Sequence, residues 1–288
     1  MPDIWQLATI AAKLLLYVGA LGATGLLIVC VAFGDVVAPV AARIRLQAFV
    51  LATLTLAASM LSFLLRGAML TGGADGMTDP EILSLLWETP VGDALVLRAF
   101  GAGLLIVGHC IARKGQWIAL VGGMLVLWSF TQIGHVTNLA QYGARLPLLL
   151  HVLGIAFWIG ILPPLHDLTR TPGTLGVAAQ LGQRFGQAAM IIVPALMLAG
   201  LLIGWMIIGR VADLVTTGYG LVLLLKVALV TVVLALAAVN KLRFVPSMQK
   251  GDPKAARDLR RSIQLEAIIF LLILTATATL TSLLSLPG

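Results

Sequence analysis

Apolar segments of about 20 residues, the length that a helix needs to cross a bilayer, follow one another along most of this chain. The 288 residues have a mean hydropathy of +1.04, and only 11% of them are charged. This composition excludes an ordinary soluble protein and predicts an all-α polytopic membrane protein with eight transmembrane helices. The predicted spans cover residues 7–32, 47–70, 93–112, 116–136, 146–165, 186–208, 219–241 and 263–284.

The segments between these spans are too short for a soluble domain, so we expect one membrane domain over residues 1–288. The first span lacks a small-residue cleavage site followed by a soluble chain, which favours a retained helix over a signal peptide. No Walker-type loop, nucleophile elbow or HExxH helix occurs in the sequence. We therefore expect neither an ATP-driven pump nor a hydrolase, and not an enzyme.

Lys and Arg are distributed unequally between the two predicted membrane faces. Three of the 19, Arg66, Arg145 and Arg210, lie on one face. Because positive residues favour the cytoplasm, the rich face is predicted to be cytoplasmic. Both termini and the acidic 71–92 segment then face the periplasm of a bacterial inner membrane. The rich face carries Arg43, Arg45, Arg113, Lys114, Arg170, Arg184, Lys241, Arg243, Lys250, Lys254, Arg257, Arg260 and Arg261.

The net charge of +7 is accordingly interpreted as an orientation signal that also favours contact with anionic membrane lipid. No motif for binding nucleic acid accompanies it. The 71–92 segment contains Asp75, Asp79, Glu81 and Glu88 but no Lys or Arg. It is predicted to be a solvated loop, with a weak landing surface for a cation or a basic partner as the alternative.

A sequence echo suggests that the eight helices form two parallel four-helix repeats. Thr89, Gly92 and Arg98 recur as Thr217, Gly220 and Lys226, each 128 residues later, in two helices of the same predicted direction. A fainter match pairs the segment 14–18, LLLYV, with 148–152, LLLHV. Chance similarity between leucine-rich segments is the alternative.

Two histidines, His135 and His151, lie on either side of a short polar link between predicted spans. An antiparallel helix pair joined there would hold both imidazoles at a similar depth below the periplasmic face. Imidazole is costly in lipid and is a good ligand for copper, zinc and haem iron, so this pair is the first candidate metal site. Met69 and Met77 are candidate additional ligands.

A second candidate cluster lies at the inner ends of the spans, where Cys30, His109, Cys110 and His166 could form a metal release site. Inert side chains are the alternative for these four residues. Two histidines near each face could also hold two bis-His haem b groups, which makes an electron-transfer cytochrome the competing function.

Three charged residues are predicted to lie within the membrane: Arg98, Lys226 and Glu266. Arg98 and Lys226 are expected either to snorkel toward the outer face or to line one shared polar cavity. Glu266 and Asn240 are predicted to face each other near the cytoplasmic end of a helix hairpin. Glu266 is expected to accept protons or a released cation, or to pair with Arg243 or Arg261 and Asn240.

The order and spacing of several short motifs resemble the copper resistance protein D family, CopD, also called PcoD. The resemblance is strongest over residues 134–280 and rests on hydropathy alone for the first 80 residues. It implies an inner-membrane protein that handles a copper ion, moves copper inward, and works beside a periplasmic CopC-like copper carrier. The matching residues are Gly134 and His135, His151 with Trp158, Gly160, Leu162 and Pro164, Tyr219 and Gly220 with Lys226, Asn240, Arg243 and Pro246, and Leu259 to Ser262 with Glu266; Thr89, Gly92 and Arg98 add to them.

Overall fold

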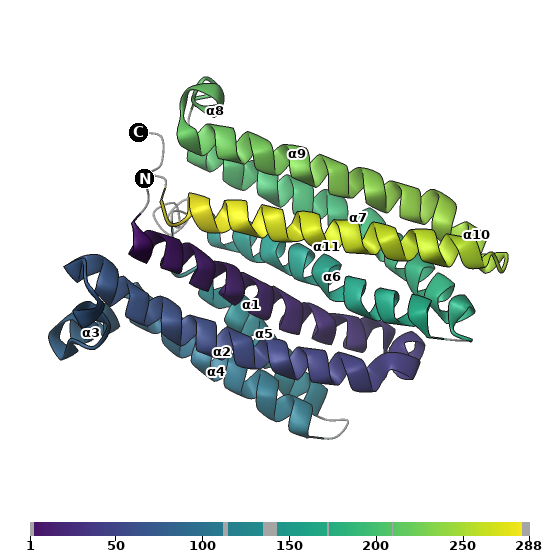
Figure 1. The fold of residues 1–288 in the computed structure, drawn as a ribbon, viewed down its shortest axis with the longest axis horizontal. Coiled ribbons are helices and arrows are strands. Elements are labelled where there is room, and N and C mark those ends of the chain that lie inside the picture. Colours follow the sequence, from purple (N-terminus) through teal and green to yellow (C-terminus); the bar gives the residue numbers. More distant parts are fainter. Residues whose placement is uncertain (1–2, 112–114, 135–142, 172, 209, 284–288) are drawn as a thin grey trace.

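The computed structural model describes residues 3–111, 115–134, 143–171, 173–208 and 210–283, which contain helices and turns but no strand. The long helices lie side by side along one common direction (Figure 1). The all-α prediction is thus confirmed. The helices are α1 (Ile4–Val37), α2 (Ala41–Thr71), α3 (Pro80–Trp87), α4 (Pro90–Cys110), α5 (Gly115–Ser129), α6 (Arg145–Arg170), α7 (Leu175–Ile208), α8 (Asp213–Thr216), α9 (Gly218–Val239), α10 (Val245–Gln249) and α11 (Pro253–Leu280).

Six helical segments in the described part of the chain are long and apolar enough to cross a membrane. The first of these, Ile4–Thr71, reverses at the 3-10 turn η1 (Ala38–Val40) and so contains both α1 and α2, which pack against each other. A further apolar helix, α5, has 15 residues. Each of the eight predicted apolar segments therefore coincides with a helix, and the chain is a membrane protein.

Two helix ends near the histidines differ from the ends of the predicted spans. The helix predicted to reach residue 136 ends at Ser129, and the turns that follow include Gly134, whose φ of +105° is left-handed and does not continue a helix. The helix predicted to end at residue 165 instead continues through Pro163 and Pro164 to Arg170. His166 consequently lies on α6 rather than in a link.

The centre of the bundle is the contact between α1 and α6. Gly25 and Gly160 meet there so closely that a Cβ atom on either glycine would collide with the other helix's backbone. Helices α2, α4 and α5 lie on the α1 side of this contact, and α7, α9 and α11 lie on the α6 side (Figure 1). The largest buried cluster of apolar side chains joins α1, α6, α7 and α11.

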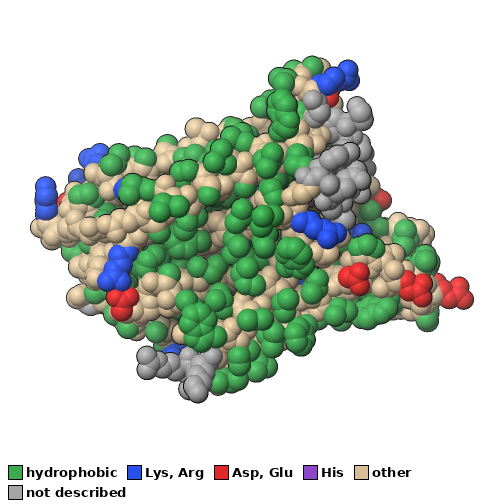
Figure 2. Space-filling model, turned by 180° about the vertical axis from the view of Figure 1, so that it is seen from behind, with side chains coloured by type: hydrophobic (Ala, Val, Ile, Leu, Met, Phe, Trp, Pro, Cys, Tyr) green, Lys and Arg blue, Asp and Glu red, His purple; other side chains and the backbone are tan. Residues whose placement is uncertain are grey.

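The start of α1 and the end of α11 lie at one end of the bundle, together with α3 (Figure 1). The Trp5 indole donates to the Gly72 carbonyl over 3.1 Å, and the Lys13 ammonium donates to the Thr281 carbonyl over 2.6 Å. These bonds tie the start of α1 to the ends of α2 and α11. Figure 2 shows Asp and Glu side chains gathered at this end and most visible Lys and Arg at the other.

The acidic 71–92 segment is more ordered than a solvated loop. It contains the 3-10 turn η2 (Ala74–Met77) and α3, which Asp79 caps by accepting from the backbone N–H groups of Glu81 and Ile82. Leu86 of α3 is buried against Phe63 of α2, while the acidic side chains stay near the surface. An apolar face on α3 explains why the segment folds back on the bundle.

The predicted sequence echo has a local counterpart in the structure. Thr89 and Thr217 are the N-cap residues of α4 and α9, and each hydroxyl accepts a backbone N–H of the first turn. Gly92 packs against the backbone of Trp87 at the end of α3, and Gly220 packs against the backbone of α8. Both helices thus begin with a capping Thr and a Gly that touches the preceding short helix.

Candidate functional site

His151 lies less than two turns from the start of α6 and is partly buried. Its Nδ1 is 3.2 Å from the carbonyl oxygen of Leu196 on α7. A carbonyl only accepts hydrogen bonds, so Nδ1 must carry the proton and Nε2 keeps its lone pair. Metal-ligating histidines typically donate their second ring N–H to a fixed acceptor in this way. Nε2 is thus the ring nitrogen through which His151 could bind a metal ion.

Two further residues shape the surroundings of His151. Gly200 leaves room for the ring, because a Cβ atom there would lie 2.9 Å from Cε1 of His151. Lys226 of α9 is partly buried and lies within electrostatic reach of His151. The His151 region is thus formed by α6, α7 and α9. The sequence analysis predicted neither the packing of His151 against Gly200 nor its contact with Leu196. Both depend on how α6 and α7 cross.

The predicted partner of His151 is not tested by the structure, because His135 lies outside the described residues. Met69 lies near the end of α2 and Met77 in η2, on the α1 side of the bundle. The contacts that the structure gives His151 are instead with α7. The two methionines therefore remain predictions without a structural link to His151.

The structure does not bring the predicted inner cluster together. Within the described ranges, which include all four residues, no group of three or more His, Cys, Asp or Glu could hold a metal ion. His109 bonds to the Leu105 carbonyl of its own helix at 2.6 Å, and Cys110 is exposed. His166 contacts Gln264 at 3.4 Å, whereas Cys30 packs beside the apolar core. The four side chains thus have different surroundings and do not form one site.

Arg98 and Lys226 are also separate. Arg98 is buried on α4, where its Nε donates to the Ser129 hydroxyl at 3.0 Å and its guanidinium lies 5.1 Å from the centre of the Phe130 ring. Lys226 lies on α9, on the other side of the bundle (Figure 1). The structure thus gives the two cations different surroundings rather than one shared cavity.

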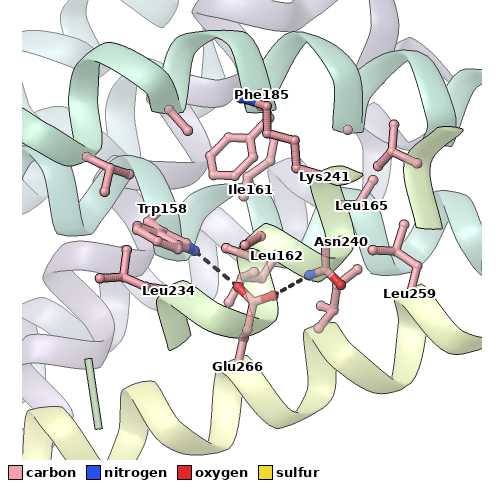
Figure 3. Close-up of a pocket in the computed structure, with 18 of the residues that line it drawn as sticks. Trp158, Ile161, Leu162, Leu165, Phe185, Leu234, Asn240, Lys241, Leu259 and Glu266 are labelled. Atoms are coloured by element: carbon pink, nitrogen blue, oxygen red, sulfur yellow. Dashed lines mark hydrogen bonds between the residues drawn. The ribbon is translucent and has the colours of Figure 1, made fainter. Parts of the chain in front are cut away.

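Glu266 of α11 has the most elaborate polar contacts inside the bundle. It is 2% exposed, and Trp158 of α6 donates its indole N–H to Oε2 at 3.1 Å. Asn240 donates from Nδ2 to Oε1 at 2.5 Å (Figure 3). The predicted pairing with Asn240 is confirmed. No ion pair with Arg243 or Arg261 occurs among the described residues.

Sequence reasoning missed the role of Trp158. A buried indole N–H needs an acceptor, which is a signal that a polar group must lie nearby, but the sequence does not say which group. Asn240 begins the π-helical turn η4 (Asn240–Phe244), a rare conformation that is frequent at functional sites. Asn240 lies at the start of this turn, opposite Glu266.

A cavity of about 190 Å³ borders this polar group and is lined by residues of α6, α7, α9, η4, α10 and α11 (Figure 3). Most of its lining is apolar, including Phe185 and Leu234. Glu266, Asn240 and Lys241 contribute its charged and amide groups. An apolar cavity with a few convergent polar groups is the usual form of a binding site for a small ligand.

Two models of known protein families match this chain. The family model of the copper resistance protein D-like N-terminal domain matches residues 1–145, and that of copper resistance protein D matches residues 179–280. The chain belongs to the copper resistance protein D family. No curated protein and no solved structure matches it.

Membership of the family confirms the resemblance noted from the sequence motifs and extends it to the first 145 residues. The chain is therefore a membrane protein of copper resistance, a family of copper-handling proteins rather than of enzymes. Copper is accordingly the metal to consider at His151. The comparisons give no support to the haem alternative.

Proposed function

We propose that this protein accepts a copper ion at the periplasmic face of the inner membrane and carries it inward. The observation that supports this most directly is His151, a membrane-embedded imidazole whose Nδ1–H is fixed by the Leu196 carbonyl. Its Nε2 is left available, and imidazole is a suitable ligand for copper in either oxidation state. In this proposal His135 supplies the second ligand, with Met69 or Met77 as additional ones.

The orientation of the proposal places both termini in the periplasm, with eight membrane crossings formed by α1, α2, α4, α5, α6, α7, α9 and α11. The separation of basic from acidic side chains between the ends of the bundle supports it (Figure 2). Exposed Arg43 and Arg45 follow the turn between α1 and α2, whereas Asp75 and Glu81 lie at the opposite end.

The proposal also includes a donor protein for the copper ion and a repeat architecture for the helix bundle. A periplasmic CopC-like carrier would deliver copper at the end of the bundle that holds the start of α6. The matching caps of α4 and α9 favour two parallel four-helix repeats, in which Arg98 and Lys226 hold equivalent positions. Membrane lipid would cover the apolar surfaces of α7 and α9, which are widely exposed.

Copper titration of His135→Ala, His151→Ala and the double variant in detergent tests the proposed site, with the metal held first as Cu(I) and then as Cu(II). Each single change should weaken copper binding at least about 10-fold, as loss of a metal-site residue usually does. The double change should add little, because the two imidazoles act on one ion.

His109→Ala is the matched control, since His109 bonds within its own helix. It should bind copper as the unchanged protein does. Near-normal affinity in the folded double variant would remove this pair from consideration. If copper binding falls only as much as the amount of folded protein falls, the histidines are structural.

A further inference from the structure

We propose that Lys13, Arg66 and Arg98 form a binding site for a phosphate group, at the end of the bundle that holds the start of α1. The phosphate belongs either to the headgroup of an acidic lipid or to free inorganic phosphate. The three cations lie on α1, α2 and α4, helices that contribute neither His151 nor Glu266. The site is therefore independent of the proposed copper transport.

The three cations come from different helices and lie close to one another. Lys13 is nine residues from the start of α1, Arg66 is five from the end of α2, and Arg98 is eight from the start of α4. These separations correspond to about one to three helical turns. The bond between Trp5 and Gly72 holds the start of α1 beside the end of α2. Lys13 interacts electrostatically with both arginines, and the arginines interact with each other.

No acidic side chain balances this cluster. All 12 Asp and Glu residues of the chain lie in its described part, and none of the ion pairs found there includes Lys13, Arg66 or Arg98. Lys13 does donate to the Thr281 carbonyl at the C-terminal end of α11, whose partial negative charge offsets part of one positive charge. Cations inside a membrane protein are costly unless they are balanced, so the cluster favours an anion.

Most N–H donors of the two guanidinium groups have no partner. Arg98 is 6% exposed, and within the described ranges its one hydrogen bond runs from Nε to the Ser129 hydroxyl. Arg66 is partly buried and makes no hydrogen bond or ion pair with any residue that the structure describes. A guanidinium presents its donors as a planar fork that matches two oxygen atoms of one anion. The unused donors therefore indicate an oxyanion as the ligand.

Two hydroxyl groups beside the cations also lack partners. Thr9 lies one turn before Lys13 on α1 and is 8% exposed, and Ser62 lies one turn before Arg66 on α2. The Oγ1 of Thr9 and the Oγ of Ser62 are both buried without a hydrogen bond to the described part of the chain. A buried hydroxyl without a partner is costly, and each of these groups could donate to an anion.

The contact between α1 and α2 brings these hydroxyls level with the cations. Gly19 packs on Thr55, where an added Cβ atom would lie 2.7 Å from Oγ1. Thr9 lies ten residues before this contact and Arg66 eleven residues after it, so the two are level on antiparallel helices. The same count, four residues nearer the contact, makes Lys13 level with the other hydroxyl. Positive and hydroxyl donors thus occur together at two successive levels.

A phosphate group suits this set of donors. It offers several oxygen acceptors around one centre, so two guanidinium groups, an ammonium and a hydroxyl can bind it together. Basic pockets between membrane helices bind the phosphate-bearing headgroups of lipids, and the cluster lies within a few turns of the helix ends. Free phosphate presents the same oxygen atoms, so both sources enter the test.

Thermal unfolding of the delipidated full-length protein in detergent tests the site. A ligand that binds only the folded state raises the unfolding temperature. Sodium phosphate is compared with sodium chloride at equal ionic strength, and phosphatidylglycerol with phosphatidylcholine, whose choline cancels the phosphate charge. A rise with sodium phosphate identifies free phosphate as a ligand, and a rise with phosphatidylglycerol alone identifies the lipid headgroup.

Arg66→Gln should raise the ligand concentration needed for half of this effect by about 10-fold or more, because it removes charged hydrogen bonds. Its fold should persist, since Arg66 bonds to no residue that the structure describes. Arg66→Lys keeps the charge and should keep most of the effect. Arg145→Gln is the matched control, because it removes the same charge from an exposed position at the start of α6. It should respond as the unchanged protein does.

The site is disproved if neither additive raises the unfolding temperature of the unchanged protein. It is also disproved if Arg66→Gln and Arg145→Gln respond alike, since that result would show diffuse attraction of anions to surface charge. Copper is absent from every sample. The outcome is therefore separate from copper binding at His151.

Discussion

Gly200 shows how a position without a side chain can determine the orientation of a neighbouring ring, here the imidazole of His151. The Nδ1 of His151 reaches the Leu196 carbonyl only because the neighbouring position on α7 carries no Cβ. The imidazole is thereby held in one tautomer, with Nε2 turned away from the bond. The metal-binding proposal thus depends on a residue that has no chemistry of its own.

Gly200→Ala is expected to weaken copper binding about 10-fold, because the added methyl group displaces the ring and breaks the bond that orients it. The helix itself should not be destabilised, since Ala is the better helix former by about 1 kcal/mol. Copper titration measures the effect. Gly204→Ala is the control, one turn further on, where a Cβ meets nothing within 4 Å. Equal affinities in the two variants would contradict this account of His151.

Lys226 and Arg98 illustrate how similar residues acquire different surroundings. Arg98 donates to the Ser129 hydroxyl and lies over the face of Phe130, and both contacts stabilise its buried charge. Lys226 lies near an imidazole instead. The two positions are equivalent in the proposed repeats, but their neighbours differ.

Among the helices, the pair α1 and α6 determines how the two sides of the bundle meet. Gly25 and Gly160 allow the two backbones to touch, as small residues do between membrane helices, where no hydrophobic driving force operates. The position of α6 also fixes Trp158 and His151. The contact between these helices therefore supports both the outer ligand and the Glu266 cavity.

Gly160→Leu should force α1 and α6 apart and lower the free energy of unfolding by about 3 kcal/mol, the upper range for overpacking in a protein core. Thermal unfolding in detergent measures this loss. Gly34→Leu is the comparison, because a Cβ at Gly34 enters open space. If both variants unfold at the same temperature, the glycine contact does not hold the bundle together.

For the whole molecule, the distribution of charge indicates how the bundle lies in the membrane. The start of α1, the end of α11 and the acidic segment share one end, and basic residues gather at the other. The proposed eight crossings agree with the position of the start of α1 and the end of α11 at the same end of the bundle.

A reporter enzyme fused after Gly288 should therefore be active in the periplasm. The same reporter inserted at Gly251, between α10 and α11, should be active only in the cytoplasm. Activity assays in intact cells measure both fusions. A cytoplasmic reporter at Gly288 would reverse the orientation and place His151 near the inner face.

The Glu266 site was only partly predictable from the sequence. Equal spacing of Asn240 and Glu266 from the hairpin turn predicted their contact, since antiparallel helices bring such positions together. An ion pair with Arg243 or Arg261 was one expected outcome, and the structure shows neutral donors instead. The approach of Trp158 from α6 has no local sequence signal, because it depends on how α6 and α11 pack together.

The sequence by itself determined the membrane class and the apolar segments, because hydropathy is a property of neighbouring residues. The tertiary structure alone decided that Gly200 admits His151, that Trp158 reaches Glu266 and that four inner Cys and His residues stay apart. These outcomes depend on the rotation and crossing of helices far apart in the chain. The rotation and crossing of these helices depend on contacts between small residues, such as that of Gly25 with Gly160. No local sequence pattern predicts which small residues will meet.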